Sequence, residues 1–211
     1  MLGKTEKVIL AIILFVGAAL RIYNYWDFSL SNDELSALAR LNYNSFSDLI
    51  MNGVRIDGHP PAAQVILWYM TKWFGNGVAV VRFPFVIAGI VSVYFMFQVA
   101  KEWVSTSAGL LSAAVFASLE FPLLYTRIAR PYALGMLFTL MAAFFWIRIV
   151  KRNQKPSDFV FLAISLALCA YSHYFAALTA AIVAFAGLFL MKGKNLKLYL
   201  AALVGALLLF L

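Results

Sequence analysis

Long apolar blocks separated by short charged segments are the feature that most limits how this chain can fold. The blocks cover residues 6–26, 82–100, 105–125, 131–150, 159–171, 174–191 and 198–211. Hydrophobic residues make up 64% of the chain and charged residues only 12%, whereas a soluble domain is about half apolar and about a quarter charged. About 20 consecutive apolar residues are enough to cross a bilayer as a helix. The pattern therefore predicts an all-α, polytopic membrane protein.

We expect six transmembrane helices and part of a seventh, forming a single transmembrane domain over residues 1–211. Because the seventh block stops at Leu211 within an apolar run, we expect the chain to be the N-terminal part of a longer protein. The net charge of +8 does not predict a nucleic-acid partner, because the basic residues lie at the ends of apolar blocks. Basic residues in these places orient membrane helices.

The distribution of charge predicts which loops face the cytoplasm, because cytoplasmic loops carry the excess of Lys and Arg. Basic residues gather before the first block and after the blocks that end near Val150 and Met191. Arg152 belongs to these inner bases, and Asp57 to the acids of the opposite side. We therefore expect a cytoplasmic N-terminus in the cell membrane, and a long outer loop over residues 27–81.

A shorter apolar block, Pro60–Phe74, lies inside that outer loop. Its 15 residues reach only about 22 Å as a helix, short of a hydrocarbon core of about 30 Å. The prolines at its start suit the first turn of a helix. Ser31 and Glu34 have the spacing of a capping box, which predicts the start of another helix. We expect both to be juxtamembrane helices rather than spans.

Four polar clusters fall on the predicted outer side, each in a different part of the chain. They are Asp33-Glu34, Gly58-His59-Pro60-Pro61, residues 126–132 and Ser172-His173-Tyr174. Nothing in the predicted topology prevents these clusters from meeting over one surface. We therefore expect most of the functional chemistry on that side.

The acidic pair Asp33-Glu34 has two interpretations. Acids in the first turn of a helix complement its dipole, and Glu34 can complete the capping box. Alternatively, one of the two carboxylates acts as a general base beside a reaction at the membrane. The local sequence leaves both interpretations open.

Arg127 and Arg130 also have two interpretations, because basic residues at the end of a span often reach for lipid headgroups. Pro131 places Arg130 at the start of a helix, however, and a helix N-terminus favours an anion. The guanidinium fork suits a phosphate group. The segment that contains Arg127, Arg130 and Tyr132 is therefore a candidate phosphate site.

His59 and His173, each taken alone, fit structural roles, and the sequence shows no close spacing of metal ligands around them. Glu120 lies near the outer end of the third block, where an acid is costly to bury, and the sequence identifies no partner for it. The metal requirement stays unknown at this point.

The order of these motifs carries a family resemblance. After the acidic pair come His-Pro-Pro, an aromatic-rich helix ending in Phe-Gly, then Arg-Phe-Pro, Ala-Arg-Pro-Tyr-Ala-Leu and Ser-His-Tyr-Phe. This order resembles the GT-C membrane glycosyltransferases, in particular the dolichyl-phosphate-mannose protein mannosyltransferase-like group that includes the aminoarabinose lipid A transferases. The similarity runs from about Arg21 to Leu188. Each motif is short, and their order on one face of the membrane makes the match specific.

The resemblance implies an inverting glycosyltransferase that moves a sugar from a polyprenyl-phosphate donor to an acceptor hydroxyl on a protein, lipid or glycan. By similarity, Asp33 matches the acid that activates the acceptor, and Glu34 lies beside it. Membrane lipids are the surrounding partner. Some relatives use a divalent metal, but no ligands for one are evident in this sequence.

The resemblance also places Arg130 in the segment that lines the donor site, and His59 at a site-lining position before two prolines. We group Arg127, Tyr132 and His173 with them as donor- or phosphate-binding residues. These assignments are expectations from similarity and from the shared outer side.

Two other functions stay open from the sequence. A transporter subunit would place ionisable residues near mid-membrane, and the apolar blocks carry almost none at their centres. An inactive fragment or scaffold is the third reading, because members of the resembled family usually have more spans and a C-terminal part.

Overall fold

The computed structural model describes residues 2–56, 58–151 and 154–211. Asp57 and Arg152, which the charge argument assigns to opposite sides, lie outside the described residues. Within those residues the secondary structure consists of helices, with no strand, so the predicted all-α class is confirmed.

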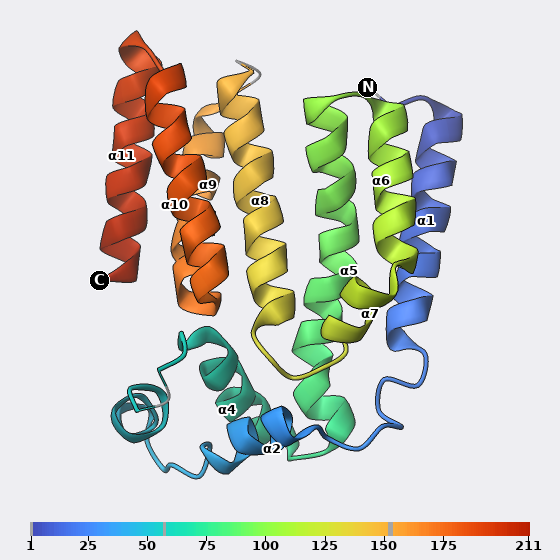
Figure 1. Cartoon of the computed structure of the whole chain (residues 1–211), viewed down its shortest axis with the longest axis vertical. Coiled ribbons are helices and arrows are strands. Elements are labelled where there is room, and N and C mark those ends of the chain that lie inside the picture. Colours follow the sequence, from blue (N-terminus) through green and yellow to red (C-terminus); the bar gives the residue numbers. More distant parts are fainter. Residues whose placement is uncertain (1, 57, 152–153) are drawn as a thin grey trace.

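Seven longer helices form the body of the molecule, and their axes run side by side (Figure 1). They are α1 (Lys4–Ile22), α5 (Val78–Trp103), α6 (Thr106–Ser118), α8 (Tyr132–Val150), α9 (Pro156–Ser172), α10 (Tyr174–Leu190) and α11 (Gly193–Phe210). The contacts of α5 with α8 join a group of α1, α5 and α6 to a group of α8, α9, α10 and α11. The result is a helical bundle with short connections.

Three helices in the described part of the chain are long and apolar enough to cross a membrane. These are α5, α8 and α11, while α6, α9 and α10 are apolar but shorter. The predicted count of six spans and part of a seventh therefore stays a prediction.

The predicted third span, residues 105–125, is divided into two helices. Helix α6 ends at Ser118, Leu119 has an extended backbone, and the short helix α7 (Glu120–Tyr125) follows. Pro122 explains the division, because it has no N–H to donate within a continuous helix but fits a first helical turn. Glu120 lies exposed in the first turn of α7.

Buried Arg21 at the end of α1 holds this break in place. Its guanidinium Nη1 donates to the carbonyl of Ala117 at 3.1 Å, and Nη2 donates to that of Phe116 at 3.4 Å. These carbonyls belong to the last turn of α6, where a cation is favourable and where helical partners are lacking.

The small helices α2 (Asn32–Ala39), α3 (Phe46–Asp48), η1 (Leu49–Val54) and α4 (Ala62–Phe74) come from the loop between α1 and α5. In Figure 1, α2 and α4 lie across one end of the bundle, opposite the end where the N-terminus lies. Gly75 follows the last residue of α4, and its φ of 88° is easily adopted by glycine.

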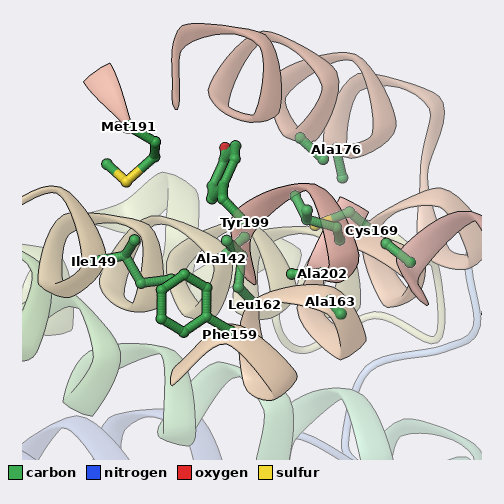
Figure 2. Close-up of a cluster of buried hydrophobic side chains, with 13 residues drawn as sticks. Ala142, Ile149, Phe159, Leu162, Ala163, Cys169, Ala176, Met191, Tyr199 and Ala202 are labelled. Carbon is green, nitrogen blue, oxygen red and sulfur yellow. The ribbon is translucent and has the colours of Figure 1, made fainter. Parts of the chain in front are cut away.

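Two hydrophobic clusters position the end of the bundle near α2 and α4. In the first, Leu67 and Trp68 of α4 pack with Phe85 of α5 and Ala37 of α2. The second lies among α8 to α11, and Figure 2 shows side chains of Leu162, Cys169 and Tyr199 in the same core. The first cluster holds α2 and α4 against α5, and the second packs α9 and α10 together.

The segment between α7 and α8 approaches α5 very closely at Gly89. A Cβ added at Gly89 would lie 2.4 Å from the Cβ of Thr126, which is fully buried. Because only glycine permits this contact, Thr126 and the arginine-containing residues that follow it are held against α5.

Candidate functional site

Glu34 in the first turn of α2 is buried and accepts four hydrogen bonds. Its Oε1 accepts from Arg82 Nε at 2.8 Å and from the Ala129 backbone N–H at 2.8 Å. Its Oε2 accepts from Arg82 Nη2 at 2.8 Å and from the Ser31 backbone N–H at 2.9 Å. One carboxylate therefore joins α2, α5 and the segment before α8.

Arg82, near the start of α5, completes this network. Its Nη1 donates to the carbonyls of Tyr25 and Phe28 at 2.9 and 3.0 Å, and its Nη2 donates to that of Ser29 at 3.0 Å. All five N–H donors of the guanidinium are thus used. The network holds the chain between α1 and α2 against α5.

Burial alone would raise the pKa of the Glu34 carboxyl. Hydrogen bonds from the Arg82 side chain and from the backbone of Ala129 and Ser31, together with the Arg82 charge, outweigh burial and lower that pKa below its ordinary value. The Glu34 carboxyl is therefore ionised at neutral pH, and each of its oxygens accepts two hydrogen bonds. The predicted capping box is confirmed, since the Ser31 side chain also accepts from the Glu34 N–H.

Asp33, the neighbour of Glu34, has a different environment. Its side chain is on the exposed side of α2, and its carboxylate forms no hydrogen bond or ion pair within the described part of the chain. Its backbone carbonyl accepts from Arg130 Nη1 at 3.4 Å. Asp33 thus combines an available carboxylate with a neighbouring cation.

Arg130 lies one residue before Pro131, at the start of α8, as the sequence predicts. Its Nε is buried and has no hydrogen-bond partner among the described residues. Arg130 also lines a small crevice with His59 and Pro60. An anion reaching this crevice would meet an incompletely satisfied guanidinium at a helix N-terminus.

His173 separates α9 from α10, and its Nδ1 accepts from the Phe175 N–H at 3.2 Å. The centre of its ring lies 5.6 Å from that of Tyr132. The hydroxyl of the adjacent Tyr174 donates to the carbonyl of Gly58, next to His59. The α9–α10 turn therefore contacts the segment that carries His59.

Burial lowers the pKa of the His173 imidazole, and the charges of His59 and Arg130 lower it further. We therefore expect His173 to be neutral at pH 7 and to titrate below its ordinary value of 6.5. The midpoint of its ring-proton chemical shift, measured by NMR in micelles, should rise in Arg130→Ala. A titration midpoint above 6.5 that is unchanged in Arg130→Ala would contradict the proximity of His173 to Arg130.

Arg127 contacts the residues that follow α1. Its Nη2 donates to the carbonyl of Tyr23, and its guanidinium carbon lies 6.0 Å from the centre of the Phe28 ring. Its Nε is buried without a hydrogen-bond partner among the described residues. Burial lowers the pKa of the Arg127 guanidinium, and the charge of Arg82 lowers it further.

Two apolar grooves flank the polar cluster. One, of about 310 Å³, has Tyr132 and His173 in its lining and continues along Thr139, Met136 and Leu140. The other, of about 690 Å³, lies among α4, α5 and α8 and includes Met70, Phe83 and Leu137. The polar groups at one end of the bundle are thus next to surfaces suited to a lipid chain.

The described residues contain no group of three His, Cys, Asp or Glu side chains that could hold a metal ion. The described residues of the cluster therefore do not fit a metal centre with three such ligands.

The structure brings together most of the residues predicted for the site. Asp33, Arg130, His59, His173 and Tyr132 are linked by contacts or electrostatic interactions. Sequence reasoning missed Arg82. A signal for it existed, since a cation inside an apolar block requires a partner, but nothing local identified that partner as Glu34.

Comparison with known families supplies the context for this geometry. Residues 58–211 match the family model described as dolichyl-phosphate-mannose-protein mannosyltransferase, which is of the GT-C type. No curated protein matches the chain. The matched range contains His59, Arg130 and His173 but not Asp33 or Glu34. Because the match spans more than half of the chain, this membrane protein belongs to the dolichyl-phosphate-mannose-protein mannosyltransferase family.

Proposed function

We propose that the protein is an inverting glycosyltransferase that moves a sugar from a polyprenyl-phosphate donor to an acceptor hydroxyl at the outer face of the membrane. The observation that carries this proposal is the contact of Arg130 with the backbone of Asp33. The contact supports the proposal because a guanidinium suited to phosphate reaches the backbone of a residue whose exposed carboxylate is suited to be a base.

In the proposed reaction, Asp33 takes the proton of the acceptor hydroxyl while the hydroxyl oxygen attacks the anomeric carbon of the sugar. The bond between this carbon and the phosphate oxygen breaks, and its electron pair leaves with the lipid phosphate. Because the hydroxyl oxygen attacks the anomeric carbon on the face opposite the leaving phosphate, the configuration at that carbon is inverted. The family match supports the reaction class, and the available Asp33 carboxylate supports the base.

Arg130 stabilises the charge that develops on the departing phosphate in this proposal. The α8 N-terminus adds to its effect, because helix N-termini favour anions. Neutral His173, with Tyr132 and His59, contacts the donor headgroup. Arg127 contributes to the positive electrostatic potential around the phosphate and does not contact it directly, since its side chain faces Tyr23 and Phe28.

Glu34 has a positioning role in this proposal instead of the general-base role that the local sequence leaves open for either member of the acidic pair. Its four hydrogen bonds leave no oxygen oriented towards a substrate. By joining α2 to Arg82 and to Ala129, it fixes the distance between Asp33 and Arg130.

Replacing Arg130 by Ala is expected to lower the rate of transfer from a polyprenyl-phosphate hexose by about 10²–10³-fold, as for loss of one preorganised stabiliser of charge. The matched control is Arg55→Ala, an exposed arginine of the loop between α1 and α5, which should retain the rate. Release of polyprenyl phosphate in membranes measures both. Equal rates for the two variants would refute the role of Arg130.

A further inference from the structure

A separate polar cavity lies at the junction of α2 and α4. It has a volume of about 450 Å³, which is within the range of about 300–1,000 Å³ for small-molecule sites. Its polar lining residues come from the loop after α2, from the C-terminal half of α4 and from the residues that follow: Asn42, Tyr43, Asn44, Thr71, Lys72 and Asn76. None of the steps proposed above uses this cavity.

The walls of the cavity are held by hydrogen bonds between the two elements. Trp68 Nε1 donates to the carbonyl of Tyr43 at 3.0 Å. Buried Gln64 Nε2 donates to the carbonyls of Ala37 and Arg40 at 2.9 and 3.0 Å, at the end of α2. The loop is therefore fixed against α4, which makes the cavity preorganised for a ligand.

Four polar groups in the lining are available to a ligand. The amides of Asn42, Asn44 and Asn76 form no hydrogen bond within the described residues, and neither does the ammonium group of Lys72. Lys72 Nζ lies 4.4 Å from the centre of the Trp68 ring, which holds the cation at the cavity. No acidic side chain is among the lining residues.

This combination indicates the chemistry of the ligand. Side-chain amides both donate and accept hydrogen bonds, as the hydroxyl groups of a sugar require. A lysine without an acidic partner favours an anionic group. The contrast with the two apolar grooves of the bundle makes a lipid chain a poor occupant of this cavity.

The position of the cavity relates it to the proposed reaction. Asp33 lies in the first turn of α2, and the cavity begins at the last turn, where Leu38 lines it. The eight residues of that helix span about 12 Å. A ligand group in the cavity would therefore be one helix length from the reacting hydroxyl.

We propose that this cavity binds an acidic saccharide, a sugar that carries a phosphate or a carboxylate, as a part of the acceptor remote from the hydroxyl that is glycosylated. This inference rests on the proposed function for its place in the reaction, but not for the binding itself. The protein thereby selects acceptors that carry a negative charge.

The test is direct binding to the full chain in detergent micelles, measured by calorimetry without a donor. The probes are glucose 6-phosphate, glucuronic acid, glucose and inorganic phosphate. Both acidic sugars should bind more tightly than glucose. Lys72→Gln should lower the affinity for the acidic sugars about tenfold, as for the loss of one charge-assisted hydrogen bond. Their relative affinities distinguish a phosphate from a carboxylate as the preferred group. The matched control is Lys194→Gln, an exposed lysine at the opposite end of the bundle, which should bind as wild type.

Asn76→Leu provides a second variant, which should lower the affinity for both acidic sugars without altering the charge of the cavity. Equal binding of acidic sugars by wild type and Lys72→Gln would overturn the proposal, as would inorganic phosphate binding as tightly as glucose 6-phosphate. Asp33→Asn should bind the sugars as wild type does. If Asp33→Asn also retains sugar transfer, the proposed function fails while the binding site stands.

Discussion

Asp33→Asn is expected to lower the rate of sugar transfer by about 10²–10⁴-fold, the contribution of a positioned general base. The amide has nearly the shape of the carboxylate but cannot take the proton of the acceptor hydroxyl. Because the Asp33 side chain is exposed and forms no internal hydrogen bond in the described part of the chain, the fold should be unaffected. Release of polyprenyl phosphate from a polyprenyl-phosphate hexose measures the loss.

The matched control for Asp33→Asn is Asp27→Asn, an exposed acid in the same loop between α1 and α5. This control should retain the wild-type rate. Wild-type turnover by Asp33→Asn would rule out Asp33 as the base. A loss of turnover accompanied by unfolding would also contradict the account, because the exposed carboxylate is expected to contribute little to stability.

Replacing Arg82 by Met should lower the free energy of unfolding by about 3–5 kcal/mol, the cost of breaking a buried ion pair by removing one partner. The substitution leaves the Glu34 carboxylate buried without its main partner. Chemical unfolding in micelles provides the measurement. The double variant Arg82→Met with Glu34→Gln should be less destabilised than the sum of the single variants, because no unpaired charge remains.

Lys101→Met is the control for this experiment, since Lys101 and Glu102 form a more exposed pair at 3.8 Å. Loss of an exposed pair costs about 0–1 kcal/mol. A similar small effect for Arg82→Met would show that the network does not hold α2 against α5.

The Glu34 carboxylate also predicts how stability depends on pH. Its pKa is lower in the folded protein than its ordinary value of 4.5, so folding favours the ionised form. The stabilisation is complete above the ordinary pKa and is lost as pH falls from there through the folded pKa. Glu34→Gln should remove this part of the acid sensitivity.

Local signals were sufficient to predict much of the fold. The capping box at Ser31 and Glu34 gave the start of α2, and the two prolines at 60 and 61 gave the start of α4. The division of the third block was not predicted, because its hydrophobicity is continuous. Pro122 was the signal, but a proline inside an apolar block is also compatible with a kinked span.

The site was less predictable because its interactions connect distant parts of the chain. The pairing of Glu34 with Arg82 joins residues 48 positions apart, and no local pattern encodes such a contact. The sequence indicated that Asp33 and Glu34 form one acidic pair. Packing separates them, since one is buried against α5 and the other faces outwards.

The proposed site requires that Asp33 and Arg130 lie on the same outer face of the membrane. The direct measurement is labelling of Asp33→Cys and Arg130→Cys, each in a Cys169→Ala background, with an impermeant maleimide on sealed right-side-out vesicles. Lys194→Cys, at the other end of the bundle, serves as the inner reference. We predict that both outer positions react in intact vesicles and that the reference reacts only after permeabilisation. Reaction of residues 33 and 130 from opposite faces would contradict the proposed site.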